Sequence, residues 1–153
     1  MIDFRENASS QQPDTFQIRE GCSRMDFSAV TAMLAAAHWS RHITEEEVRK
    51  ASANSALVIG AFLPDGEQIG FARVVSDKVR FAYLMDVIIR EDQRSSGAGE
   101  QLVRTILSHP ELSDVYQWML VTTYAHSFYE KCGFVRTRRA DNLMELLREP
   151  PHR

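Results

Sequence analysis

The chain has 153 residues, enough for one hydrophobic core and little beyond it, and its formal net charge is only −3 at pH 7. Its Lys and Arg residues are scattered without a run or a one-sided helical stripe, which argues against nucleic acid as a partner. No stretch reaches the roughly 20 apolar residues of a membrane-spanning helix, and Asp3, Arg5 and Glu6 stand where a secretory signal would be apolar, so we expect a cytoplasmic protein without membrane contact.

The first predicted elements are a tail, a strand and a helix. Residues 1–14 are polar and without period, which is typical of a loose tail. Residues 15–19 alternate between polar and apolar side chains, as a short strand does. Asp26 or Ser28 can cap a helix that runs to about His38.

A second helix and a hairpin come next. Thr44 and the glutamates after it form a capping box that starts a helix reaching Ala53. Strands over 56–63 and 68–76 then flank Pro64-Asp65-Gly66, a sequence with the chemistry of a tight turn.

The second half of the chain alternates strands and helices. Residues 81–89 are apolar, β-branched and aromatic, which indicates a central strand. A helix with regularly spaced apolar residues follows Gly99 and ends before Pro110. The remaining expected elements are a strand over 116–122, a short helix over 125–133 and a last strand over 142–147.

A glycine-bearing turn joins the central strand to the next helix. Its residues are Arg94, Ser95, Ser96, Gly97, Ala98 and Gly99. Such a junction points free N–H groups and a positive dipole end at one place, which suits a phosphate or pyrophosphate. Taken alone, the two glycines are also explained by ending a strand and capping a helix. The turn is not a P-loop, because Glu100 and Gln101 occupy the positions of its Lys and Ser/Thr, and the third glycine of a dinucleotide fingerprint is missing.

A second segment downstream runs Ala125-His126-Ser127-Phe128-Tyr129-Glu130-Lys131-Cys132-Gly133-Phe134. Together with the glycine turn it resembles the GNAT superfamily of N-acetyltransferases. The pyrophosphate loop of that family has the form Arg/Gln-x-x-Gly-x-Gly/Ala, which Arg94, Gly97 and Gly99 match. The next block of the family ends in Tyr-Glu-Lys-x-Gly-Phe, which residues 129–134 match. From Phe71 onward the resemblance is close, whereas before it mainly the order of the elements agrees.

The resemblance implies an α/β (α+β) fold in a single domain over residues 15–153. A mixed central sheet would have helices on both faces and a splay between its fourth and fifth strands. Acetyl-CoA would lie in that splay as cosubstrate, and its acetyl group would pass to a primary amine of a small molecule or peptide. A non-catalytic acyl-CoA-binding or sensing module is the alternative, and it would not require the tyrosine of the second block.

The resemblance also assigns the contacts with the cofactor. Main-chain atoms of Val87, Ile88 and Ile89 would bond the pantetheine arm as an added strand would, and the amides from Arg94 to Gly99 would hold the pyrophosphate. The further expected contacts are Thr122, Phe128 and Lys131. Thr122 departs from the Asn that many members carry but can still form a hydrogen bond, and Tyr124 replaces an Asp common before Ala-His, which could alter the choice of substrate.

Acetyl transfer requires a neutral amine, stabilisation of charge on the thioester oxygen and a proton for the departing thiolate. The N–H of Val87 is the candidate donor that stabilises the charge on the thioester oxygen. The resemblance makes Tyr129 the general acid, since a phenol pKa near about 10 is close to that of a thiol; the alternative is a core aromatic ring. Asp86 is predicted to take the amine's proton directly or through water, to hold the ammonium, or instead to bond the backbone or Arg73 away from the cleft. His126 is the rival base, with a helix cap as its alternative.

The acceptor pocket of this fold is built mainly by the first two helices and their connection. There Trp39 could stack on a substrate and Arg41 could pair with a carboxylate, which would favour a small amine with an acidic group. The alternative is that Trp39 fills the core and Arg41 is solvated. Relatives often form homodimers, and the apolar run over 143–147 would be a suitable edge strand for one.

Neither cysteine is predicted to do chemistry. Cys22 and Cys132 are too few for a disulfide framework and have no metal-ligand spacing, so we expect no metal. Cys132 lies beside the tyrosine of the second block, where a small buried hydrophobe is the preferred interpretation.

Overall fold

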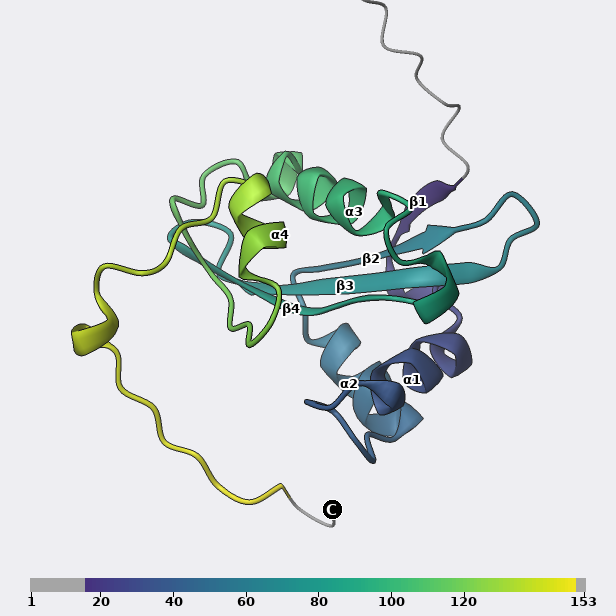
Figure 1. Ribbon diagram of the computed structural model, residues 1–153, viewed down its shortest axis with the longest axis horizontal. Helices are drawn as coiled ribbons and strands as arrows, with labels where there is room; N and C mark the ends of the chain where they lie inside the picture. Colours follow the sequence, from purple (N-terminus) through teal and green to yellow (C-terminus); the bar gives the residue numbers. More distant parts are fainter. Residues whose placement is uncertain (1–15, 151–153) are drawn as a thin grey trace, which may run out of the picture.

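Five strands form a mixed sheet in the computed structural model, which describes residues 16–150 (Figure 1). The strands are β1 (Gln17–Glu20), β2 (Leu57–Phe62), β3 (Gln68–Ser76), β4 (Phe81–Ile89) and β5 (Gln117–Met119). The first four pair antiparallel in chain order, whereas β5 joins β4 in parallel. The mixed sheet expected from the sequence is confirmed.

Helices cover both faces of this sheet (Figure 1). The helices are α1 (Phe27–Ala36), α2 (Glu45–Ala53), α3 (Ala98–Leu107) and α4 (His126–Lys131), with short 3₁₀ turns at Cys22–Arg24, Glu91–Gln93, Pro110–Leu112 and Ala140–Asn142. Val58 and Ile59 are neighbours in β2 but pack into different clusters, because successive side chains of a strand point to opposite faces. Val58 joins the buried residues of α1, and Ile59 joins those of α3.

The ends of the early elements follow the signals in the sequence. Asp26 caps α1 by accepting a hydrogen bond from the Ala29 N–H at 3.1 Å. The helix ends at Ala36, two residues before the expected end. Thr44 and Glu47 form both hydrogen bonds of the capping box that starts α2. Gly66 has φ 92° in the β2–β3 turn, a backbone conformation that L side chains rarely adopt.

The pairing of β4 with β5 is short, and this opens the sheet. It covers three residue pairs and ends where Tyr83 meets Met119. The expected strand over 116–122 is therefore shorter than predicted, since the residues after Met119 no longer lie against β4. Beyond that point the two segments diverge, which leaves the space between the fourth and fifth strands that the fold was expected to contain.

A β-bulge lies on β4 beside this opening. Met85 pairs with Arg73 and Ile88 pairs with Phe71, so two residues of β4, Asp86 and Val87, stand opposite one residue of β3. Asp86 takes φ 54°, in the left-handed region that Asp tolerates better than most side chains. Such a bulge bends its strand and changes the direction of its backbone groups.

The expected last strand over 142–147 is wrong. A 3₁₀ turn ends at Asn142, and residues 143–150 have no regular structure; Figure 1 shows this segment running away from the sheet. Met144 is 99% exposed, so this run lies against no other strand and cannot form the paired backbone hydrogen bonds that a strand needs.

Two further expectations concern the N-terminal residues and membrane-spanning helices. The predicted tail, residues 1–14, lies outside the described residues, as does the first residue of the predicted strand over 15–19. None of the helices within residues 16–150 is long and apolar enough to cross a membrane.

Candidate active site

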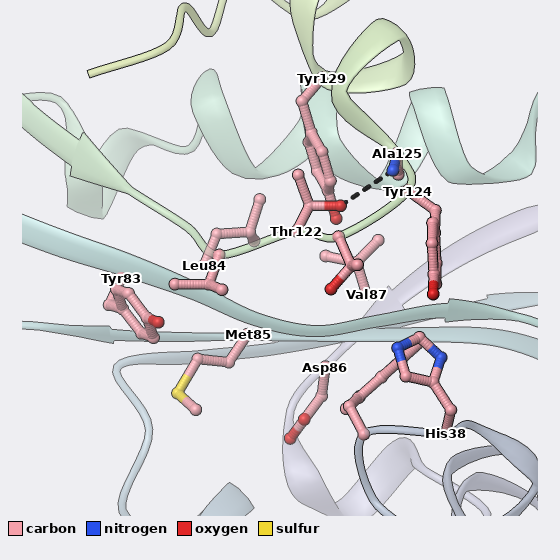
Figure 2. Close-up of a pocket in the computed structure, with 13 residues that line it drawn as sticks. His38, Tyr83, Leu84, Met85, Asp86, Val87, Thr122, Tyr124, Ala125 and Tyr129 are labelled. Carbon is pink, nitrogen blue, oxygen red and sulfur yellow. Dashed lines mark hydrogen bonds between the residues drawn. The ribbon is translucent and has the colours of Figure 1, made fainter. Parts of the chain in front are cut away.

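A pocket of about 320 Å³ occupies the opening between β4 and the segment after β5 (Figure 2). Its lining comes from three places: residues 83–87 of β4, residues 121–125 with Tyr129 of α4, and His38 with Trp39 from the connection after α1. Segments far apart in the sequence thus meet at the point where the sheet splays. The size is at the lower end of that usual for small-molecule sites.

Tyr129 projects from α4 toward β4 beside Thr122 (Figure 2). Phe128 and Phe134 hold its ring edge-to-face, with centroid separations of 4.9 and 5.9 Å. Burial, with a smaller contribution from Cys132, raises the pKa of Tyr129 to about 12, because the anionic form is poorly solvated there. The phenol is therefore protonated at every physiological pH and has a proton to give.

Asp86 lies in the same pocket but points away from Tyr129 (Figure 2). The Arg73 Nε donates to its Oδ2 at 2.5 Å, and the two side chains are 12% and 15% exposed. Arg73 also donates to the Ser55 hydroxyl at 3.4 Å. The ion pair ties the bulge of β4 to β3, and it matches the alternative in which Asp86 bonds Arg73. The hydrogen bond to Ser55 links Arg73 to the segment after α2.

The other expected pocket residues take several positions. Val87 lines the pocket, while Ile88 is buried in the core and Ile89 lies half-buried against the start of α3. Thr122 also lines it, and its hydroxyl accepts the Ala125 N–H at 3.0 Å. This bond supports the start of α4 and leaves the hydroxyl proton of Thr122 available for donation.

The glycine turn follows β4 directly and leads into α3. Gly97 has φ 92° and caps α3, and a Cβ built there would meet no atom within 4 Å. Within the described chain, the N–H groups of Ser95, Ser96 and Gly97 donate to no backbone carbonyl. Open space and unpaired donors at one helix N-terminus fit a phosphate group.

The remaining expected contacts with the cofactor lie near this turn or beyond it. Phe128 packs against the first turn of α3, because a Cβ at Gly99 would lie 3.4 Å from its Cζ. Arg94 is exposed, and its Nε donates to the Ile89 carbonyl at 3.4 Å. Lys131 is exposed at the end of α4.

Two proposed residues lie apart from the pocket. Arg41 is exposed and does not line it, although its neighbour Trp39 does. His126 begins α4 and lines a second space of about 520 Å³ that also has Tyr129 in its wall. Sequence reasoning did not assign His38 to the site; its place next to Trp39 was the available signal.

Comparisons with known proteins agree with this geometry. Residues 54–136, more than half of the chain, match the family described as acetyltransferase (GNAT) domain. A solved structure from Xanthomonas campestris pv. campestris, assigned to the GNAT acetyltransferases, is 32% identical, with a TM-score of 0.81 over 86% of this chain and 92% of that one. The chain belongs to the GNAT acetyltransferases. Membership of this family implies acyl transfer from acetyl-CoA.

Other solved structures share the GNAT fold at lower identity. One from Deinococcus radiodurans R1, assigned as an acetyltransferase, is 26% identical, with a TM-score of 0.72 over 88% of this chain and 90% of that one. Glucosamine-6-phosphate N-acetyltransferase from Arabidopsis thaliana is 17% identical, with a TM-score of 0.63 over 89% of this chain and 99% of that one. No curated protein matches the chain significantly.

Proposed function

We propose that this GNAT domain transfers the acetyl group of acetyl-CoA to the primary amine of a small molecule, with Tyr129 as general acid. The observation that carries the proposal is the position of the Tyr129 phenol in the wall of a pocket that opens where β4 leaves β5. Release of free thiol from acetyl-CoA in the presence of a broad panel of amines tests it. Tight binding of acetyl-CoA with no turnover of any amine would instead support a binding module. A cytoplasmic location stays a prediction of the sequence.

Different pocket residues are proposed to act on different atoms during acetyl transfer. The neutral amine attacks the thioester carbon, so a C–N bond forms and the C–S bond breaks. The N–H of Val87, redirected by the bulge, is proposed to stabilise the negative charge on the carbonyl oxygen. Tyr129 gives its proton to the departing sulfur, and the proton lost by the amine nitrogen returns through water to the phenolate. The products are an amide and a thiol, and the tyrosine is regenerated.

A raised pKa makes a phenol a weaker acid. Proton transfer from Tyr129 to the departing thiolate therefore requires that the pKa of the thiol be raised as well. In water an alkyl thiol has a pKa near about 8.5, well below the value of about 12 for Tyr129. The thiolate, however, forms in the same poorly solvated space, and burial raises the pKa of a thiol as it raises that of a phenol. Cys132, beside Tyr129, shows this effect, since burial raises the pKa of its thiol.

We propose that Asp86 acts through its ion pair by holding the bulge, and that it does not take the amine's proton. Asp86→Asn keeps the side-chain shape and tolerates φ 54°, but leaves the Arg73 charge without its partner. We expect a loss of about 3 kcal/mol in the free energy of unfolding, because breaking a largely buried pair costs that much. We also expect kcat to fall by the same factor at every pH.

Denaturant unfolding and kcat measured from pH 6 to 10 check this prediction. Lys78→Met, which breaks the exposed Lys78–Glu111 pair, is the matched control and should cost less than about 1 kcal/mol. Arg73→Lys, which keeps a positive charge opposite Asp86, should show smaller losses of stability and of kcat than Asp86→Asn. A fall in kcat confined to low pH, where the amine must lose its proton, would make Asp86 the base.

We also propose that the protein forms a homodimer through its C-terminal segment. Met144, Leu146 and Leu147 are 99%, 80% and 78% exposed, and large apolar side chains left in water favour association. Light scattering at micromolar concentration should give twice the mass of the chain. Leu146→Glu together with Leu147→Glu should give the monomer mass, whereas a monomer mass for the unmodified protein would contradict the proposal.

A further inference from the structure

The acceptor side of the pocket is walled by aromatic rings that face solvent. The His38 ring lies 5.2 Å from that of Trp39, nearly perpendicular to it, and 5.4 Å from that of Tyr124, tilted by 60°. The rings come from the α1–α2 connection and from the segment before α4, and Figure 2 shows the His38 ring next to Tyr124. Three rings therefore meet at one end of the pocket, beside Asp86.

Two of these rings contribute little buried apolar surface to the fold. Trp39 is 53% exposed and Tyr124 is 84% exposed, so neither buries much of its apolar surface in the domain. An aromatic ring that lines a pocket and remains in water has a face that a ligand can cover. This arrangement excludes the interpretation of Trp39 as a plug in the core.

The charges in the wall indicate which ligands are excluded. The thirteen lining residues include one carboxylate, Asp86, and neither Lys nor Arg. Arg73 is the partner of that carboxylate and lies outside the lining, and Arg41 does not reach the pocket. A substrate carboxylate would thus meet no cation in the wall, and the adjacent Asp86–Arg73 pair has no free positive charge to offer it. An ammonium group would be attracted by the ring faces.

We infer that the acceptor is a small aromatic primary amine without an acidic group, which packs on the exposed rings of Trp39 and Tyr124 beside His38. The inference rests on the proposed acetyl transfer to an amine and specifies its substrate class. A pocket of about 320 Å³ has room for one ring and a short aminoalkyl arm next to an acetyl group. The expected amino-acid-like substrate, with Arg41 on its carboxylate, is replaced by this one.

Three amines with the same arm test the inference. They are 2-phenylethylamine, 2-cyclohexylethylamine, which lacks the aromatic ring, and 4-(2-aminoethyl)benzoate, which carries an acidic group. Their dissociation constants for the CoA-loaded protein are measured by calorimetry, so the result does not depend on turnover. We expect 2-phenylethylamine to bind about 10-fold more tightly than each of the others. The cyclohexyl amine would lose the contacts with aromatic rings, and the benzoate would find no cation in the wall.

Substitutions of the two exposed rings test whether they cause the preference for the aromatic amine. Trp39→Leu and Tyr124→Leu should each remove most of the preference for the phenyl over the cyclohexyl amine, and both should fold because the rings are so exposed. Tyr116→Leu removes a ring that is 70% exposed outside the pocket, and it should leave all three affinities unchanged. Thermal melting of each variant shows that it is folded.

The two proposals fail in different ways. Turnover of amines with equal affinity for the three probes, or with tighter binding of the benzoate, would overturn the inference and leave acetyl transfer standing. Binding of none of the probes would overturn it as well. The expected order of affinities without release of thiol would support the aromatic acceptor site and contradict the transferase.

Discussion

Replacing Tyr129 by Phe should lower kcat by about 10²- to 10⁴-fold while the KM for acetyl-CoA changes little. The substitution removes one hydroxyl and keeps the ring that packs against Phe128 and Phe134. Binding and folding should therefore survive, and the loss should fall on the step in which the thiolate leaves. Thiol release at saturating acetyl-CoA and amine measures it.

The pH dependence adds a second test of Tyr129. Because burial raises the pKa of its phenol to about 12, kcat of the unmodified enzyme should show no loss of this acid up to pH 10. The folded-state pKa lies above the unfolded value of about 10, so the stability tied to this group is complete below pH 10 and is lost as the pH rises toward 12. Tyr129→Phe should lack that alkaline loss of stability.

Tyr116→Phe is the control for these measurements, since it removes a hydroxyl from an exposed ring outside the pocket. It should leave kcat and its pH profile unchanged. Near-parental kcat in Tyr129→Phe on a good acceptor would overturn the acid assignment. The thiolate would then leave unassisted or take its proton from water.

Replacing Gly97 by Glu should abolish the thermal stabilisation that acetyl-CoA gives. At a ligand concentration about 100 times the dissociation constant, a bound ligand contributes about 2.7 kcal/mol, which raises the Tm of a chain of this size by about 5 to 10 °C. The new carboxylate would stand in the open space at the start of α3, where the N–H groups of the turn are proposed to hold the pyrophosphate. Repulsion between anions should then prevent binding.

Gly66→Glu is a closely matched control for Gly97→Glu. Both glycines have φ 92°, and a Cβ at either meets no atom within 4 Å, so the strain and the added charge are alike. Gly66 lies in the β2–β3 turn, away from α3. Both variants should lose similar stability without ligand, and Gly66→Glu should keep the full shift with acetyl-CoA. An equal shift in Gly97→Glu would show that the cofactor phosphates bind elsewhere.

Local signals predicted most of the fold because each depends on residues close together in the chain. Asp26 and Thr44 cap helices through N–H groups three residues ahead, and Gly66 supplies the turn of a hairpin. The last strand could not be predicted in this way. The apolar run over 143–147 has the composition of a strand, but a strand exists only where a neighbouring strand pairs with it, and none of the described strands does so here.

The sequence by itself determined the order of the elements as far as α4, the glycine turn before α3 and the family block around Tyr129, because these depend on composition, spacing and motif. Only the tertiary structure decided what the side chains meet. It placed Asp86 against Arg73, left Arg41 outside the pocket and brought His38 to Tyr124. Asp86 meets a residue of the neighbouring strand, and His38 meets a residue much further along the chain. Both contacts depend on how β4 bulges and leaves β5, which no local pattern contains.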